Sequence, residues 1–138
     1  VSISTVCIHR SVFYDVGMFD ESLPCCEDYD FWLRVSLKYP FYLIPRALTL
    51  KEGGHSDQVS RKYWGMDRFR IVAIKKILES HTLPPSQYKV CMEELEKKSM
   101  ILIKGCLKRG KFKEAEEYQR YMLAHKNLFH RVGGAGQG

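Results

Sequence analysis

The sequence lacks several features that define whole classes of protein. No apolar run approaches the ~20 residues of a membrane-spanning helix, and no secretory signal peptide is visible. The five cysteines are odd in number and have no C-x-x-C spacing, which argues against a disulfide framework and a structural zinc site. With 45% hydrophobic and 28% charged residues, the sequence predicts a globular protein of the reducing cytoplasm.

Positive charge is scarce in the first part of the chain. Residues 1–60 contain five Lys or Arg against eight Asp or Glu, a net of −3, whereas residues 61–138 contain seventeen against eight, a net of +9. Such a shift predicts a boundary near residue 60. The basic half could face anionic lipid at the inner side of a membrane, or it could be an ordinary solvated helical surface. Its cations alternate with glutamates and no recognition motif is present, so we expect no nucleic-acid partner.

The most informative segment is residues 27–34, E-D-Y-D-F-W-L-R. Its apolar spacing predicts a helix in which Asp30 and Arg34 lie one turn apart and can form an ion pair. Glu27 and Asp28 then fall in the first turn, where the helix dipole favours carboxylates. Two acids in this position can be a catalytic base and its neighbour, or they can simply cap the helix. The octet alone leaves both interpretations open.

The segments around the octet occur in a distinctive order. The turn Gly17-Met18-Phe19-Asp20-Glu21 precedes it, and a strand-like F-Y-L-I-P and then G-G-H-S-D-Q-V-S follow it. This order resembles the second half of the catalytic domain of family 2 inverting glycosyltransferases, with Met18 replacing the second glycine of a G-G-F-D-E turn. The resemblance covers about residues 1–62. It implies that residues 1–60 are the C-terminal half of a GT-A catalytic domain, with an α/β fold.

The resemblance also implies roles for individual residues. Asp28 is expected to be the base that takes the proton of the acceptor hydroxyl, with Glu27 beside it. Cys25 and Cys26, just before this acid pair, are expected to be ordinary loop thiols. The remaining assignments are His55 near the metal or the diphosphate, Gln58, Ser60 and Arg61 in a substrate loop, and Asp30, Trp32 and Arg34 in the structure of the helix.

The implied reaction transfers a sugar, with inversion, from a nucleotide-sugar donor to a saccharide or lipid-linked acceptor, as in the synthesis of cell-envelope polysaccharides. Enzymes of this kind hold a divalent metal, Mn or Mg, through a D-x-D motif in a preceding half. Neither that motif nor a Gly-rich phosphate loop precedes the octet. We therefore expect a piece of a longer enzyme, inactive alone, whose metal is held mainly elsewhere. The alternative is a degenerate, non-catalytic half that acts as a helical protein-interaction module.

Periodicity predicts the secondary structure around these motifs. Alternating β-branched and aromatic residues favour strands at residues 2–8, 41–44 and 47–51, and helices are expected at 11–16 and 28–38. An all-α tail of about three helices is expected over residues 61–132, followed by a flexible Gly-rich end at 133–138.

Within the tail, the segment 105–115 resembles the turn of a tetratricopeptide-like hairpin. The middle helix is expected at about residues 86–108. The tail positions expected to be buried are Phe69, Val72, Ala73, Ile77, Cys91, Leu95, Leu102, Cys106, Phe112, Ala115 and Met122.

Overall fold

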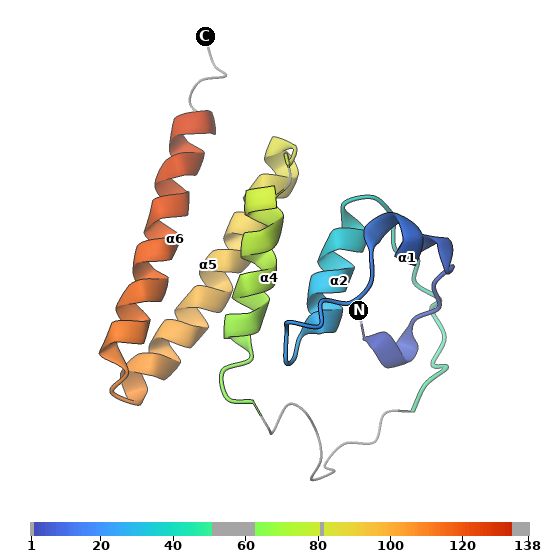
Figure 1. Cartoon of the computed structure of the whole chain (residues 1–138), viewed down its shortest axis with the longest axis horizontal. Helices are drawn as coiled ribbons and strands as arrows, with labels where there is room; N and C mark the ends of the chain where they lie inside the picture. Colours follow the sequence, from blue (N-terminus) through green and yellow to red (C-terminus); the bar gives the residue numbers. More distant parts are fainter. Residues whose placement is uncertain (1, 51–62, 81, 134–138) are drawn as a thin grey trace. The chain divides into compact units, whose positions relative to one another are not determined.

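The structure, a computed structural model, describes residues 2–50, 63–80 and 82–133, and every regular element in these ranges is a helix (Figure 1). The chain divides into two compact units, Val1–Ala73 and Ile74–Gly138, which are described separately below. The boundary predicted near residue 60 falls outside the described residues, so the predicted domain limits stay a prediction.

The predicted α/β fold is wrong for the described residues, which contain no strand or sheet. At residues 2–8 the structure has a short 3₁₀ helix, η1 (Ile3–Thr5), flanked by extended backbone at Ser2 and Val6. Residues 41–50 form no regular element. A strand exists only when a neighbouring strand pairs with its N–H and C=O groups, and the described segments offer these apolar stretches no such neighbour. Pro45 also removes one donor from the segment.

The first unit is built on α1 (Ser11–Val16) and α2 (Glu27–Ser36), which contact each other. Helix α1 has the predicted bounds, whereas α2 begins one residue earlier and ends two residues earlier than predicted. Phe31 is fully buried between the two helices. Its ring stacks on Phe13 at 5.0 Å between centroids and lies 4.8 Å from Phe19. The other buried side chains of this core are Val12, Trp32 and Val35.

Helix α4 (Asp67–Ser80) runs across the division between the two units. Its buried side chains include Ile71, Ile74 and Ile77, which are spaced three residues apart along the helix. Val72 was predicted to be buried but is 41% exposed. One residue along a helix turns the side chain by about 100°, which moves Val72 off the face that carries Ile71.

The second unit contains a hairpin of α5 (Pro85–Lys108) and α6 (Phe112–Gly133), which pack along each other (Figure 1). Gly110, with a φ of 71°, allows the sharp turn between them. The N–H of Lys111 bonds to the carbonyl of Cys106 at 2.9 Å and closes the end of α5. Phe112, predicted to be buried, is 66% exposed, because it is the first residue of α6 and lies at the turn.

The buried positions of the hairpin follow the predicted stripe closely. Leu95, Leu102 and Cys106 are buried on α5, as is Ala115 on α6, and Cys91 is half-buried. No helix in the described ranges is long and apolar enough to cross a membrane.

Leu102→Ala should lower the free energy of unfolding by about 2–5 kcal/mol, because Leu102 is 4% exposed and its removal leaves a cavity. Leu95→Ala, at a fully buried position, should cost a similar amount. The neighbouring Ile101 is 51% exposed, so Ile101→Ala is a matched control that should change stability by about 0.5 kcal/mol or less. Urea unfolding measures all three. Equal losses at positions 101 and 102 would contradict the observed packing of α5.

Candidate active site at the start of helix α2

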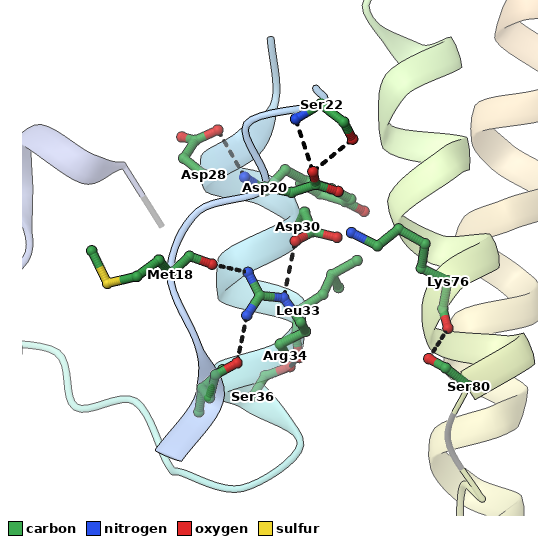
Figure 2. Close-up of polar contacts among 12 residues, drawn as sticks. Met18, Asp20, Ser22, Asp28, Asp30, Leu33, Arg34, Ser36, Lys76 and Ser80 are labelled. Carbon is green, nitrogen blue, oxygen red and sulfur yellow. Dashed lines mark hydrogen bonds and ion pairs between the residues drawn. The ribbon is translucent and has the colours of Figure 1, made fainter. Parts of the chain in front are cut away.

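The acid pair lies in the first turn of α2, as the sequence predicts. Glu27 and Asp28 are the first two residues of the helix, and both are partly exposed. Asp28 Oδ1 accepts a hydrogen bond from the backbone N–H of Tyr29 at 2.8 Å (Figure 2). Within the described residues, Asp28 Oδ2 and the carboxylate of Glu27 have no hydrogen bond or ion pair. Three of the four carboxylate oxygens are therefore available to a ligand.

The residue before the acid pair has an unusual backbone. Cys26 caps α2 in the left-handed region, with a φ of 62° and a ψ of 21°, and it is the only described non-glycine residue with a positive φ. This conformation costs an ordinary L-residue about 1–2 kcal/mol. Cys26 is buried, and its Sγ lies 3.8 Å from the carbonyl oxygen of Met66. The side chain thus anchors the start of the helix.

Arg34 fixes α2 to the turn that follows α1 (Figure 2). Its Nε donates to Asp30 Oδ2 at 2.9 Å, Nη1 to the carbonyl of Val16 at 2.7 Å, and Nη2 to the carbonyl of Met18 at 2.8 Å. Asp30 is fully buried, and the predicted ion pair at i, i+4 is present. The guanidinium also lies 5.4 Å from the centre of the Phe31 ring. Arg34 therefore joins the turn, the helix and the aromatic core.

A second link, between α1 and the segment that follows α2, is more exposed. Lys38 Nζ donates to Asp15 Oδ1, and the hydroxyl of Tyr39 to Asp15 Oδ2, both at 2.8 Å. The bond from Lys38, followed by that from Tyr39, lowers the pKa of the Asp15 carboxyl. Both partners of the ion pair are about half-exposed, so water screens it and its contribution is small.

The turn before α2 has its own local order. Asp20 Oδ1 accepts hydrogen bonds from the backbone N–H of Ser22 at 2.9 Å and from its hydroxyl at 2.6 Å (Figure 2). This is the Asx-turn pattern, in which a side-chain carboxylate replaces a backbone acceptor. Asp20 thus shapes the loop that leads to the acid pair.

Two arginines of α4 were missed in the sequence, and one of them, Arg70, contacts the helix that carries the acid pair. The guanidinium of Arg70 lies 6.0 Å from the centre of the Tyr29 ring and pairs with Asp67 at 2.8 Å. Arg68 donates from Nη2 to the carbonyl of Trp64 at 2.9 Å, while its buried Nε has no hydrogen-bond partner in the described part of the chain. Their R-F-R spacing does not predict a shared site, because residues two apart on a helix point in different directions.

The two cysteines that precede α2 lie in the loop before the helix, and both are buried. Burial raises the pKa of the Cys26 thiol to about 12 and also raises the pKa of Cys25. The charge of Arg70 acts in the opposite direction on both thiols, but burial outweighs it. Both cysteines are therefore protonated at neutral pH and unsuited to nucleophilic chemistry.

The first unit also contains a cavity of about 520 Å³. Its lining includes Val12, Trp32, Val35 and Phe41, and it is mostly apolar, with neither Glu27 nor Asp28 among the residues that line it. Trp32 contributes to this wall, and its buried Nε1 has no hydrogen-bond partner among the described residues.

The other predicted site residues cannot be placed. His55, Gln58, Ser60 and Arg61 lie outside the described residues. Among the residues that are described, no group of three or more His, Cys, Asp or Glu side chains is placed to hold a metal ion. The acid pair supplies at most two protein ligands, so the part of the site seen here does not by itself form a metal centre.

Comparison with known proteins gives partial matches. A 55-residue stretch, 40% of the chain, is 33% identical to an uncharacterized glycosyltransferase of Rickettsia felis. Stretches of 50 residues, 36% of the chain, are 36% and 38% identical to uncharacterized glycosyltransferases of Rickettsia conorii and Rickettsia bellii.

These stretches cover only 9%, 8% and 7% of the three relatives, so the similarity spans less than a tenth of their length. No family model and no solved structure matches the chain. The chain thus shares sequence with glycosyltransferases, while membership of family 2 and the GT-A fold are not shown.

Arg34→Met should lower the free energy of unfolding by about 3–5 kcal/mol, because it removes the ion pair to the fully buried Asp30 carboxylate and the two hydrogen bonds to the carbonyls of Val16 and Met18. Lys38→Met is the matched control. It breaks an ion pair whose partners are 51% and 45% exposed, so it should cost less than about 1 kcal/mol. Urea unfolding monitored by tryptophan fluorescence measures both. A similar cost for the two variants would show that Arg34 is not the main link.

Thiol labelling should separate the cysteines of the folded chain. At about pH 8, the exposed Cys7 should react fast, and the buried Cys25, Cys26 and Cys106 slowly. Raising the pH toward about 10 should not activate Cys26, because its pKa near 12 is still higher and the thiol stays neutral. In denaturant all five cysteines should react alike. Rapid labelling of Cys26 in the native chain would contradict its burial.

Proposed function

We propose that this chain supplies the acceptor side of a glycosyltransferase active site, with Asp28 as the general base. The observation that carries the proposal is the acid pair at the start of α2, whose carboxylates are partly exposed and mostly free of protein partners. The sequence similarity to glycosyltransferases supports the reaction class. The nucleotide-sugar class of donor, the inversion and a saccharide or lipid-linked acceptor are proposed from the resemblance in the sequence.

The geometry at Asp28 suits a base. One carboxylate oxygen is held by the N–H of Tyr29, which fixes the side chain, and the other is open to a substrate hydroxyl. In the proposed step the acceptor oxygen bonds to the anomeric carbon as the bond from that carbon to the diphosphate oxygen breaks. The electron pair leaves with the nucleoside diphosphate, and the hydroxyl proton goes to Asp28. Glu27 is beside it and positions the acceptor.

Simple helix capping explains less of this arrangement. A cap uses its carboxylate to satisfy first-turn N–H groups, and Asp28 does so with one oxygen. Glu27 makes no such bond among the described residues. Arg68 and Arg70 are cations on the same unit, and Arg70 lies close to Tyr29, next to Asp28. Such cations could offset the charge that develops on a leaving diphosphate.

A divalent metal, Mn or Mg, is part of the proposal because the resemblance implies it. The described residues contain no group of three ligands, so no step is assigned to it here. His55, Gln58, Ser60 and Arg61 keep their proposed places near the metal, the diphosphate and the substrate loop.

Asp28→Asn in the full-length protein should reduce turnover by about 10²–10⁴-fold, because the amide keeps the bond from Tyr29 but cannot accept the proton. The KM for the donor should change little. Release of nucleoside diphosphate from a panel of nucleotide sugars, with Mn or Mg present, measures both quantities.

Glu117→Gln is the control for the loss of an acid, because Glu117 is exposed on α6. It should leave turnover unchanged. Normal turnover in Asp28→Asn would move the base to Glu27 or elsewhere. Wild-type protein that turns over no donor in the panel would favour the alternative, a non-catalytic interaction module.

A further inference from the structure

The turn between α5 and α6 concentrates positive charge. Residues 104–113 contain five Lys or Arg and no Asp or Glu. All five cations are exposed: Lys104, Lys108, Arg109, Lys111 and Lys113. We call residues 104–113 the basic tip, because they form one end of the hairpin (Figure 1).

Helix stability explains only part of this charge. Cations favour the C-terminal end of a helix, and Arg109 donates from Nη1 to the carbonyl of Gly105 at 2.9 Å at the end of α5. The same rule disfavours Lys111 and Lys113, which lie at the N-terminal end of α6. Lys111 is compensated by Glu114 at 3.0 Å. Lys104, Lys108 and Lys113 have no ion pair within the described ranges.

Large apolar side chains are exposed among these cations. Phe112 is 66% exposed and Leu107 is 48% exposed. Their positions in the sequence alternate with the charged residues, so the basic tip presents both kinds of side chain at the same turn. Cations together with exposed Phe and Leu side chains are the combination that binds the interface of an anionic bilayer. Lysine stems can lie along the apolar boundary while their ammonium groups reach lipid phosphates.

The acids nearest to the basic tip are on the first turns of α6. Glu114 is engaged by Lys111, and Glu116 pairs with Arg120 at 3.1 Å. Glu117 is exposed further along the helix. The negative charge therefore begins only after the tip ends, and apart from the pair between Lys111 and Glu114 it does not offset the lysines of the tip.

We propose that the basic tip docks the α5–α6 hairpin on an anionic membrane surface, with its cations on lipid headgroups and Phe112 and Leu107 at the interface. The argument is charge complementarity, because each cation near an anionic leaflet contributes to binding and the tip brings five together. The proposal goes beyond the transfer reaction and does not rest on it. Its test uses no sugar substrate, so the two can fail separately.

The test is co-flotation of the chain with phosphatidylcholine vesicles that contain or lack phosphatidylglycerol. The wild-type chain should bind the anionic vesicles only, and added salt should weaken the binding. The triple variant Lys104→Gln, Lys108→Gln, Lys113→Gln should lower the partition coefficient on the order of 100-fold, about fivefold for each cation removed. All three side chains are exposed, so thermal unfolding should be unchanged.

A second triple variant, Lys89→Gln, Lys97→Gln, Lys126→Gln, is the matched control. It changes the net charge equally at exposed lysines that each lie near a glutamate on α5. This control should keep most of the binding, and Phe112→Ser should weaken binding while leaving the salt dependence intact.

Three results would overturn the proposal. They are equal losses in the two triple variants, equal binding to vesicles without phosphatidylglycerol, and no binding of the wild-type chain to either vesicle. Tighter binding to duplex DNA than to anionic vesicles would also overturn it, in favour of a nucleic-acid partner.

Discussion

One guanidinium group, that of Arg34, holds the acid-bearing helix in place. It reaches the buried Asp30 in its own helix, the carbonyl of Val16 at the end of α1, and the carbonyl of Met18 in the turn that follows α1. Gly17 lies between those two carbonyls with a φ of 89°, a conformation that glycine adopts without strain. The direction of α2, and with it the position of Glu27 and Asp28, depends on these polar bonds together with the ring contacts of Phe31 to Phe13 and Phe19.

The parts of the fold that could be predicted are those set by local spacing. The Asp30–Arg34 pair follows from i, i+4 spacing, and the bounds of α1 and α5 follow from periodicity and from Gly and Pro signals. The two carbonyl partners of Arg34 could not be predicted from the sequence, because a backbone carbonyl of any residue type can accept a hydrogen bond. The strand predictions at residues 2–8 and 41–44 are wrong for the same reason. Apolar alternation produces a strand only if a distant segment of the chain pairs with it.

The candidate site shows the same division between local and long-range information. Glu27 and Asp28 stand out in the sequence because they are adjacent acids before an aromatic helix. Arg70 reaches Tyr29 from a segment about forty residues later, so only the folded chain brings it near the acid pair. The environment of Cys26 is likewise set by burial in the folded chain, which the residue types around it do not reveal. The raised pKa of the Cys26 thiol comes from burial, and its side chain contacts the carbonyl of Met66, forty residues along the chain, which no local pattern indicates.

When the charges that form ion pairs are set aside, the remaining charge is concentrated in fewer places than the sequence suggests. In the first unit, Asp30 and Asp15 are paired with cations, which leaves the negative charge of the acid pair uncompensated by hydrogen bonds from Lys or Arg. In the second unit, the glutamates of α5 engage lysines along the helices, whereas the basic tip contains no acid at all. Net charge thus remains at two places where the fold supplies little compensation.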